Sequence, residues 1–185
     1  HGYQHESSPE LTREEMEEIL DKSESLLFDI TGKKPAGHRA PESVLQDFMP
    51  ELLAKRGYLY SSSMKDCDWA YLWEKDQKEL PLVELPNDIT MDDFTYYYFT
   101  FSDPAVRCMY PNREVFGNWK QEFDGLALEG NKIFILKLHP QMIGRTSRIG
   151  MVGEFIAYMQ NHGAWITTCE DVARYVQKQN GGNRA

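Results

Sequence analysis

Apolar and polar positions along the chain predict helices and strands in alternation, and the first helix is the best marked. Thr12 and Glu15 have the spacing of a capping box, which begins a helix. Gly32 is suited to end it, because glycine readily adopts the left-handed conformation of a helix C-cap. Between these ends, apolar side chains recur at helical spacing: Met16, Ile19, Leu20 and Leu27.

The same pattern predicts four more helices and four strands. The helices are expected over residues 43–56, with a kink or restart at Pro50, and over 112–128, 147–161 and 168–179. The strands are expected over residues 58–62, 81–86, 132–138 and 165–167. This alternation favours parallel strands joined by helices, in a doubly wound sheet or a barrel. We expect one α/β domain over residues 1–179 and a frayed tail over 180–185.

Composition and charge exclude several classes of partner. The chain has 185 residues, of which 20 are Lys or Arg and 29 are Asp or Glu, for a net charge of -9. This balance argues against nucleic acid or an anionic membrane surface, since both require a basic face. The longest apolar run, residues 133–136, is far shorter than the roughly 20 residues of a membrane span. Three widely spaced cysteines suggest a reducing compartment, and we expect a cytoplasmic location.

Two histidines lie four residues apart at the start of the chain. Imidazole is a good neutral ligand for zinc and similar divalent ions, so His1 and His5 are candidate metal ligands. A pair of histidines at this position could equally be the remnant of a tag or cleavage site.

Three other clusters place reactive side chains where strands and loops meet. His139 ends the predicted strand 132–138, where a general acid or base could act, although it could instead be bonded to backbone. Arg39 lies in a loop and could orient a carboxylate, or form a surface ion pair. Asp92 and Asp93 could assist acid–base chemistry, or simply shape a turn.

Residues 87–111 are rich in aromatic side chains, which could line a groove for sugar rings or cover the core. We expect Tyr97 from this stretch and Pro41 from the Arg39 loop to contact substrate.

Four segments in order, HGYQHE, HRAPES, LPNDITMDDF and ILKLHPQMIGR, resemble the polysaccharide deacetylase (NodB-homology) family. The sequence is most similar to its cytoplasmic branch of peptidoglycan deacetylases and cyclic imide hydrolases. The resemblance implies a distorted (β/α) barrel and a divalent metal, usually zinc, held by one aspartate and two histidines. It assigns His1 and His5 as metal ligands, His139 as the general acid and Arg39 as the residue that orients the catalytic base. Asp93, or its neighbour Asp92, corresponds to the fourth motif.

The chain departs from this family at its first motif. That motif holds two aspartates, the general base and the third metal ligand, and it lies upstream of the paired histidines. We therefore expect these residues to form the C-terminal part of a barrel whose first strands are missing, and to be inactive alone. A second polypeptide piece carrying those strands, or a second copy of the chain, is an expected partner.

The implied reaction is metal-dependent hydrolysis of a non-peptide amide C–N bond, chiefly deacetylation of N-acetyl sugars in peptidoglycan or chitin. Hydrolysis of small cyclic amides or imides, as in allantoinases, remains open. A non-catalytic carbohydrate-binding module and an α/β scaffold with structural histidines remain open too. The catalytic hypothesis requires His1, His5 and His139 to meet at one rim.

Overall fold

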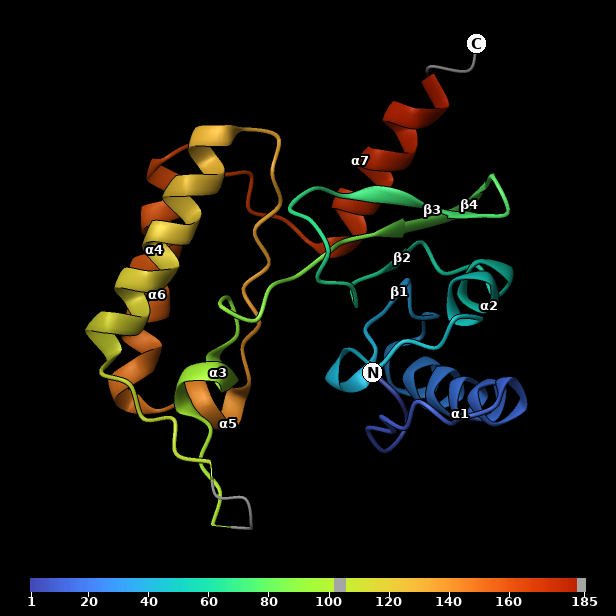
Figure 1. Ribbon diagram of the computed structural model, residues 1–185, viewed down its shortest axis with the longest axis horizontal. Helices are drawn as coiled ribbons and strands as arrows, with labels where there is room; N and C mark the ends of the chain where they lie inside the picture. The colour runs from blue at the N-terminus through green and yellow to red at the C-terminus, as the bar shows by residue number, and fades with distance from the viewer. Residues whose placement is uncertain (102–105, 183–185) are drawn as a thin grey trace. The chain divides into compact units, whose positions relative to one another are not determined.

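The computed structural model describes residues 1–101 and 106–182. The chain forms two compact units, each described here by itself (Figure 1). The first unit comprises His1–Asp66, Ala70–Pro86 and Thr167–Ala185, and the second comprises Cys67–Trp69 and Asn87–Ile166.

The expectation of one domain over residues 1–179 stays a prediction. The expectation of a frayed tail over 180–185 also stays a prediction; helix α7 (Cys169–Gly182) includes residues 180–182. Residues 183–185 lie outside the described residues.

The first unit contains a four-stranded sheet in the order β1-β2-β4-β3. Strands β1, β2 and β4 are parallel, and β3 is antiparallel to β4. Because parallel strands run in the same direction, their carboxyl ends meet at one edge, and the loops after them begin there. The sheet confirms the predicted mixed α/β class. Its strands are β1 (Gly37–His38), β2 (Tyr60–Ser61), β3 (Tyr71–Lys75) and β4 (Lys78–Glu84).

Two predicted strands of this unit are confirmed, since 58–62 contains β2 and 81–86 overlaps β4. The hairpin partner β3 was not predicted. It joins β4 through Asp76 and Gln77, which have φ of 50° and 62°. A two-residue hairpin turn with positive φ at both positions usually contains glycine or Asn-Gly, so this sequence carries no ordinary hairpin signal.

The helices of the first unit follow the capping signals. Helix α1 (Arg13–Thr31) has the predicted capping box at Thr12, and Gly32 caps its end with a φ of 70°. Helix α2 (Met49–Lys55) is shorter than the predicted 43–56. Pro50 explains the difference, because proline is tolerated in the first turn of a helix but breaks its interior. The residues before it form a separate 3₁₀ turn, η1 (Pro41–Ser43).

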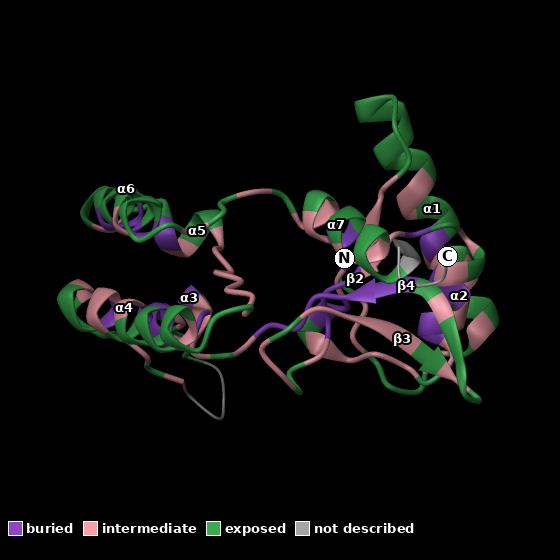
Figure 2. Ribbon diagram, turned by 90° about the horizontal axis from the view of Figure 1, so that it is seen from above, coloured by how far each residue is buried: buried purple, intermediate pink, exposed green. Residues whose placement is uncertain are grey.

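The core of the first unit lies between its helices and the sheet. Helix α2 packs on β4, and α7 packs on β2, β3 and β4. Figure 2 shows buried positions along β4 and α2. The buried side chains come from α1, α2, the segment before β2, and β4: Met16, Leu20, Met49, Leu52, Leu53, Tyr58 and Leu82.

The second unit is built mainly from helices. Its long helices are α4 (Asn112–Glu129) and α6 (Thr146–Asn161), as predicted, and they pack together around Trp119 and Phe155. Two short helices, α3 (Asp93–Tyr97) and α5 (Pro140–Ile143), also pack against each other.

The predicted strands 132–138 and 165–167 are wrong. Residues 132–138 are extended but form a single parallel bridge, between Asp92 and Lys137. A strand requires a continuous neighbour with matching backbone groups. Here Met91 and Asp93 pair with Lys137, and Asp68 accepts the N–H of Ile133, but no one segment follows the run along its length. Residues 165–167 form no strand in the described structure. An apolar run predicts burial more reliably than it predicts pairing.

Candidate active site

Arg39 follows β1 at the edge of the sheet where the parallel strands end. Its Nε donates a hydrogen bond to the Ser62 carbonyl at 2.9 Å, and its Nη2 donates to Ser62 Oγ at 2.7 Å. Ser62 follows β2 directly. The predicted surface ion pair is therefore not what holds Arg39, because its planar guanidinium is anchored on the neighbouring strand end.

His1 and His5 lie side by side in the same unit. Their ring centroids are 4.9 Å apart, with the planes nearly perpendicular. His1 Nδ1 lies 2.6 Å from the Arg39 carbonyl oxygen. Because a carbonyl only accepts hydrogen bonds, Nδ1 carries a proton, and Nε2 keeps its lone pair whenever the ring is neutral. Metal-binding histidines typically have this arrangement, with the second nitrogen bonded to a carbonyl or carboxylate. The pair fits two positions of a divalent metal site.

Pro41 begins the 3₁₀ turn that follows Arg39, and it is buried. The next two residues, Glu42 and Ser43, have φ of 53° and 62°. Two successive non-glycine residues in the left-handed region are strained, which often accompanies a functional loop. A contact between Pro41 and substrate stays a prediction.

In the second unit, Asp93 is bonded to His139 at two points. Asp93 Oδ2 accepts from the backbone N–H of His139 at 2.9 Å, and Asp93 Oδ1 lies 2.6 Å from His139 Nδ1. The Asp93 side chain is fully buried. Burial raises the pKa of Asp93, and the hydrogen bonds from His139 offset part of this rise. The dyad is built by the backbone, because Asp93 N–H donates to the Lys137 carbonyl at 3.1 Å.

Asp92 makes different contacts from Asp93. Its Oδ1 accepts the backbone N–H of Phe94 at 2.9 Å and so caps helix α3, while Oδ2 pairs with Lys137 Nζ at 2.9 Å. The sequence left open which aspartate serves the fourth motif, and the hydrogen bonds single out Asp93 as the partner of His139.

Asp92, Asp93 and His139 also offer ligand atoms within 4.8 Å of one another, close enough to hold a metal ion. Two observations weigh against that use. The Lys137 ammonium already neutralises Asp92, and Asp93 directs both oxygens at His139. A cation here would have to displace both interactions. The arrangement is better suited to proton transfer through His139.

The aromatic side chains of 87–111 divide between core and surface. Tyr97 is only 3% exposed, its hydroxyl donates to Asn112 Oδ1, and the Arg148 guanidinium lies 3.8 Å from its ring centroid. Its contact with substrate stays a prediction. The ring beside His139 is that of Phe94, 4.7 Å away between centroids, and Tyr98 stacks on Phe94 at 4.5 Å. The sequence did not assign these two rings to the site. Residues 102–105 of this stretch lie outside the described residues.

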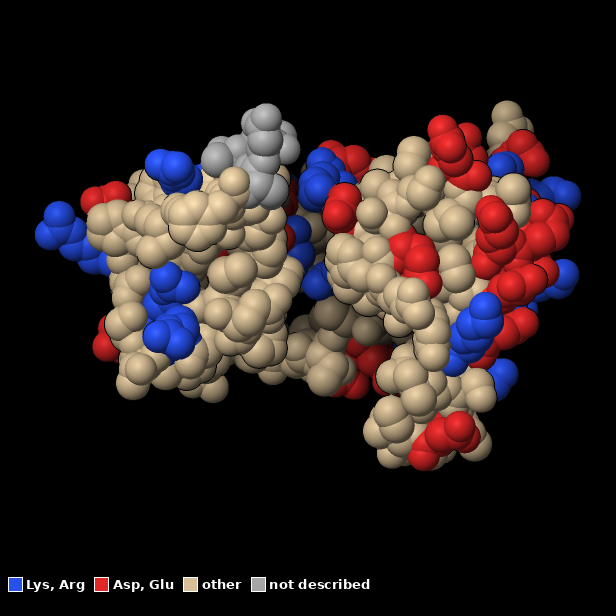
Figure 3. Space-filling model, turned by 90° about the horizontal axis from the view of Figure 1, so that it is seen from below, with Lys and Arg blue, Asp and Glu red and all other residues tan. Residues whose placement is uncertain are grey.

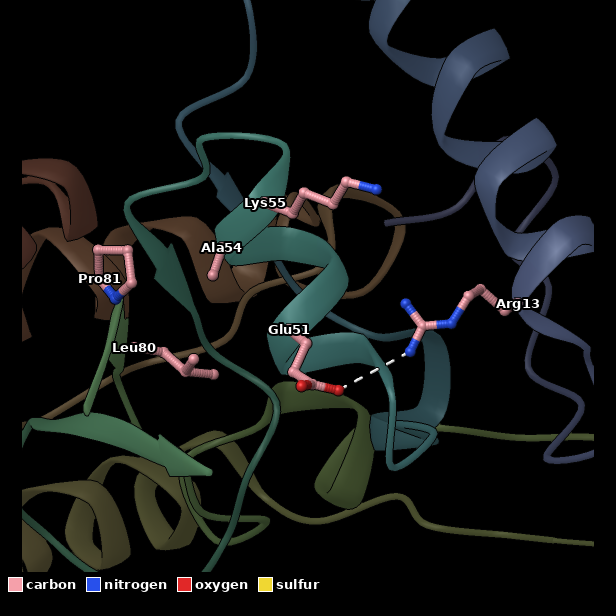
Figure 4. A pocket seen from close by; sticks show the side chains of 6 residues that line it. All are labelled: Arg13, Glu51, Ala54, Lys55, Leu80 and Pro81. Carbon is pink, nitrogen blue, oxygen red and sulfur yellow. Dashed lines mark ion pairs between the residues drawn. The ribbon is translucent and has the colours of Figure 1, made fainter. Parts of the chain in front are cut away.

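Surface hollows do not define the site. Figure 4 shows one beside α2, crossed by an ion pair between Arg13 and Glu51 at 3.8 Å. It is lined by no residue predicted to act in catalysis or binding: Arg13, Glu51, Ala54, Lys55, Leu80 and Pro81. In Figure 3, acidic side chains gather over the first unit. No helix among residues 1–101 and 106–182 combines the length and apolar character that crossing a bilayer demands.

The fold is similar to that of a protein described as a polysaccharide deacetylase from Mycobacterium smegmatis. The two structures match with a TM-score of 0.88 and 28% identity, over 97% of this chain and 62% of that one. The chain is therefore similar in fold to the polysaccharide deacetylases, with a mixed α/β architecture and a partial sheet.

Two curated relatives belong to the same class. A peptidoglycan deacetylase-like protein of Gibberella zeae is 28% identical over 208 residues, which cover 94% of this chain and 61% of that protein. The peptidoglycan deacetylase of Helicobacter pylori is 27% identical over 192 residues, covering 90% and 66%. The chain thus spans less than two thirds of the length of either relative.

The chain belongs to glycosyl hydrolase family 57, whose family model matches residues 1–165. The resemblance to polysaccharide deacetylases is confirmed by the relatives. The matching family model, however, is not the NodB-homology family named from the sequence.

Proposed function

We propose that this chain carries catalytic residues of a metal-dependent hydrolase that removes acetyl groups from N-acetylated sugars of a polysaccharide such as peptidoglycan or chitin. The observation that carries the proposal is the buried Asp93 carboxylate bonded to both the backbone and the ring of His139. Two relatives are named as peptidoglycan deacetylase or similar to it, which supports a polysaccharide substrate. We also propose that the chain belongs with the cytoplasmic branch of these deacetylases.

His139 serves as the general acid in this proposal. With Nδ1 directed at Asp93, Nε2 is the nitrogen that can deliver a proton to the departing amine as the C–N bond breaks. The Asp93 carboxylate fixes the ring orientation and stabilises the imidazolium before it donates. Burial strengthens this interaction, because it removes competing water from the carboxylate.

His1 and His5 would hold a divalent metal, most simply zinc, as two of its protein ligands. Such an ion would supply Lewis-acid activation of water and of the amide carbonyl. The Arg39 carbonyl fixes His1 by accepting from Nδ1. The Arg39 guanidinium orients the catalytic base, an aspartate according to the family resemblance. The proposal includes the expectation that the histidines of both units act on one substrate.

Acetate release from N-acetylglucosamine oligomers and peptidoglycan fragments tests the proposal, using the protein at its natural length. We expect His139→Gln to lower kcat at least about a hundredfold, since general acid catalysis contributes that much. Changing both His1 and His5 to Gln should abolish bound zinc in elemental analysis. His162→Gln is the matched control, because His162 is exposed at the end of α6 and bonds only locally to Tyr158. Undiminished acetate release by His139→Gln would refute the assignment.

The same assay separates the other candidate functions. Ring opening of hydantoins or cyclic imides, without acetate release, would indicate an allantoinase-like hydrolase. Sugar binding that survives His139→Gln, in a parent without turnover, would indicate a carbohydrate-binding module. If the protein neither takes up metal nor binds sugars, the remaining interpretation is an α/β scaffold with structural histidines.

The compartment and the assembly are also proposals. The three cysteines, Cys67, Cys108 and Cys169, are free, which supports a reducing compartment such as the cytoplasm. Strands β1 and β3 stand at the two ends of the sheet order, and unpaired strand edges favour association with a second chain or a second copy.

A further inference from the structure

We propose that Glu84 is a positioning residue for Arg39, acting through the turn that follows β2. The inference rests on the proposed function, in which Arg39 orients the catalytic base. Glu84 is the last residue of β4, and its side chain is fully buried. A carboxylate is costly to bury unless hydrogen bonds replace its hydration, so its partners indicate its role.

Glu84 accepts hydrogen bonds from the turn after β2 and from β3. Its Oε1 accepts the consecutive backbone N–H groups of Ser63 at 2.7 Å and Met64 at 2.9 Å. Its Oε2 accepts Nε1–H of Trp73 at 2.9 Å. Two consecutive amides directed at one oxygen fix the direction in which the chain leaves β2. Hydrogen bonds to a charged acceptor are the stronger kind, so this is a firm anchor.

The fixed turn presents Ser62 and Ser63 to the loop that carries Arg39. Ser62 supplies both acceptors of the guanidinium, and its Oγ donates to the Leu85 carbonyl at 2.7 Å. Ser63 Oγ accepts the backbone N–H of Ala40 at 3.0 Å. Glu84 thus controls both the side chain of Arg39 and the backbone after it. Within the described part of the chain, Arg39 Nη1 makes no hydrogen bond, so it can turn to a carboxylate.

A purely structural carboxylate would stabilise the sheet without favouring one position of Arg39. A positioning carboxylate predicts that its effect on catalysis disappears when Arg39 is absent. A double-mutant cycle measures this difference, because residues acting through one network are not additive.

The informative substitution is Glu84→Gln, which keeps size and one acceptor oxygen. That oxygen can still bind the Ser63 and Met64 amides, but the new NH₂ group then opposes Nε1–H of Trp73. Adding Trp73→Phe removes the opposing donor and should restore the turn. The control is Glu74→Gln, because Glu74 is an exposed carboxylate on β3.

Deacetylation kinetics on N-acetylglucosamine oligomers test the proposal with the protein at its natural length. We expect Glu84→Gln to lower kcat about tenfold, with KM changed less than about twofold, and the addition of Trp73→Phe to recover most of the loss. In an Arg39→Ala background, Glu84→Gln should change kcat less than about twofold. An equal loss with and without Arg39, or no recovery when Trp73→Phe is added to Glu84→Gln, would overturn the inference.

A second readout does not depend on turnover. The Nε–H proton of Arg39, bonded to Ser62, should give a resolved, slowly exchanging NMR signal in the parent. Glu84→Gln should broaden it, and the addition of Trp73→Phe should restore it. If no variant or parent hydrolyses any amide but this signal follows the expected order, the proposed function fails and the positioning role stands. An unchanged signal in Glu84→Gln overturns the positioning role itself.

Discussion

The pH dependence of stability should be dominated by one buried histidine, His38. Its side chain is 5% exposed and meets the Tyr58 ring edge-on at 6.4 Å between centroids. Its Nδ1 has no hydrogen-bond partner among the described residues. Burial lowers the pKa of His38 from 6.5 to about 3. The ring is therefore neutral in the folded protein under ordinary conditions.

The sign follows from which state binds more protons. Between pH 6.5 and about 3, the unfolded chain binds a proton at this position and the folded chain does not. Stability from this group is therefore complete above pH 6.5 and is lost as the pH falls. The free energy of unfolding should drop by about 2 kcal/mol at pH 5 and by between about 4 and 5 kcal/mol near pH 3.

Urea unfolding followed by far-UV circular dichroism at pH 8, 7, 6 and 5, in the presence of EDTA, measures this loss. EDTA removes any linkage between metal binding and protonation at His1 and His5. The His38→Gln variant should lose about 2 kcal/mol less than the parent between pH 8 and pH 5. His162→Gln, at an exposed histidine, should follow the parent. Parallel pH profiles for His38→Gln and the parent, or a His38 ring signal that titrates near pH 6.5, would refute the reasoning.

Three further tests, two of them with a comparison substitution, probe an ion pair, the backbone and the chemistry. Arg56→Met should lower the free energy of unfolding by about 2 kcal/mol in urea titrations, because this half-buried guanidinium at the end of α2 pairs with two acidic residues of α1. Arg174→Met removes an exposed ion pair within α7 and should lower the free energy of unfolding by less than about 0.5 kcal/mol. Gly32→Ala should lower the free energy of unfolding by about 1 kcal/mol, since φ at Gly32 is 70°. At Gly117, inside α4, an added methyl group meets open space, so Gly117→Ala should raise the melting temperature. Asp93→Asn should lower kcat about a hundredfold in the acetate assay with little change in KM, because His139, the proposed general acid, would lose its carboxylate partner; unchanged kcat would contradict that role.

Local signals predicted the elements whose ends are fixed by neighbouring residues. The capping box at Thr12 and the terminator Gly32 delimit α1 because each acts within a few residues. Pairing between strands is not local. The apolar run 132–138 looks like a strand in sequence, yet it has backbone partners at few points, whereas the polar hairpin of β3 and β4 pairs along most of its length.

The candidate site shows the same division between local and distant information. Arg39 was predicted from its place in a loop, and His139 from its place at the end of an apolar run before Pro140; the family resemblance gave each its role. The choice between Asp92 and Asp93 needed the structure, because only the hydrogen bonds separate a helix cap from a partner of His139.

The buried role of Glu84 was not predicted from the sequence, for a physical reason. In LVELP it appears as a polar residue at the end of an apolar strand, where a carboxylate ordinarily reaches solvent. Its burial depends on β3 closing over it with Trp73 and on the β2 turn supplying two amides. The Glu84 carboxylate, the Trp73 ring and the two amides come from three separate segments, so no pattern within one segment predicts that they lie in contact. Sequence patterns can therefore identify candidate reactive groups, while the geometry around Arg39 depends on buried contacts between strand ends.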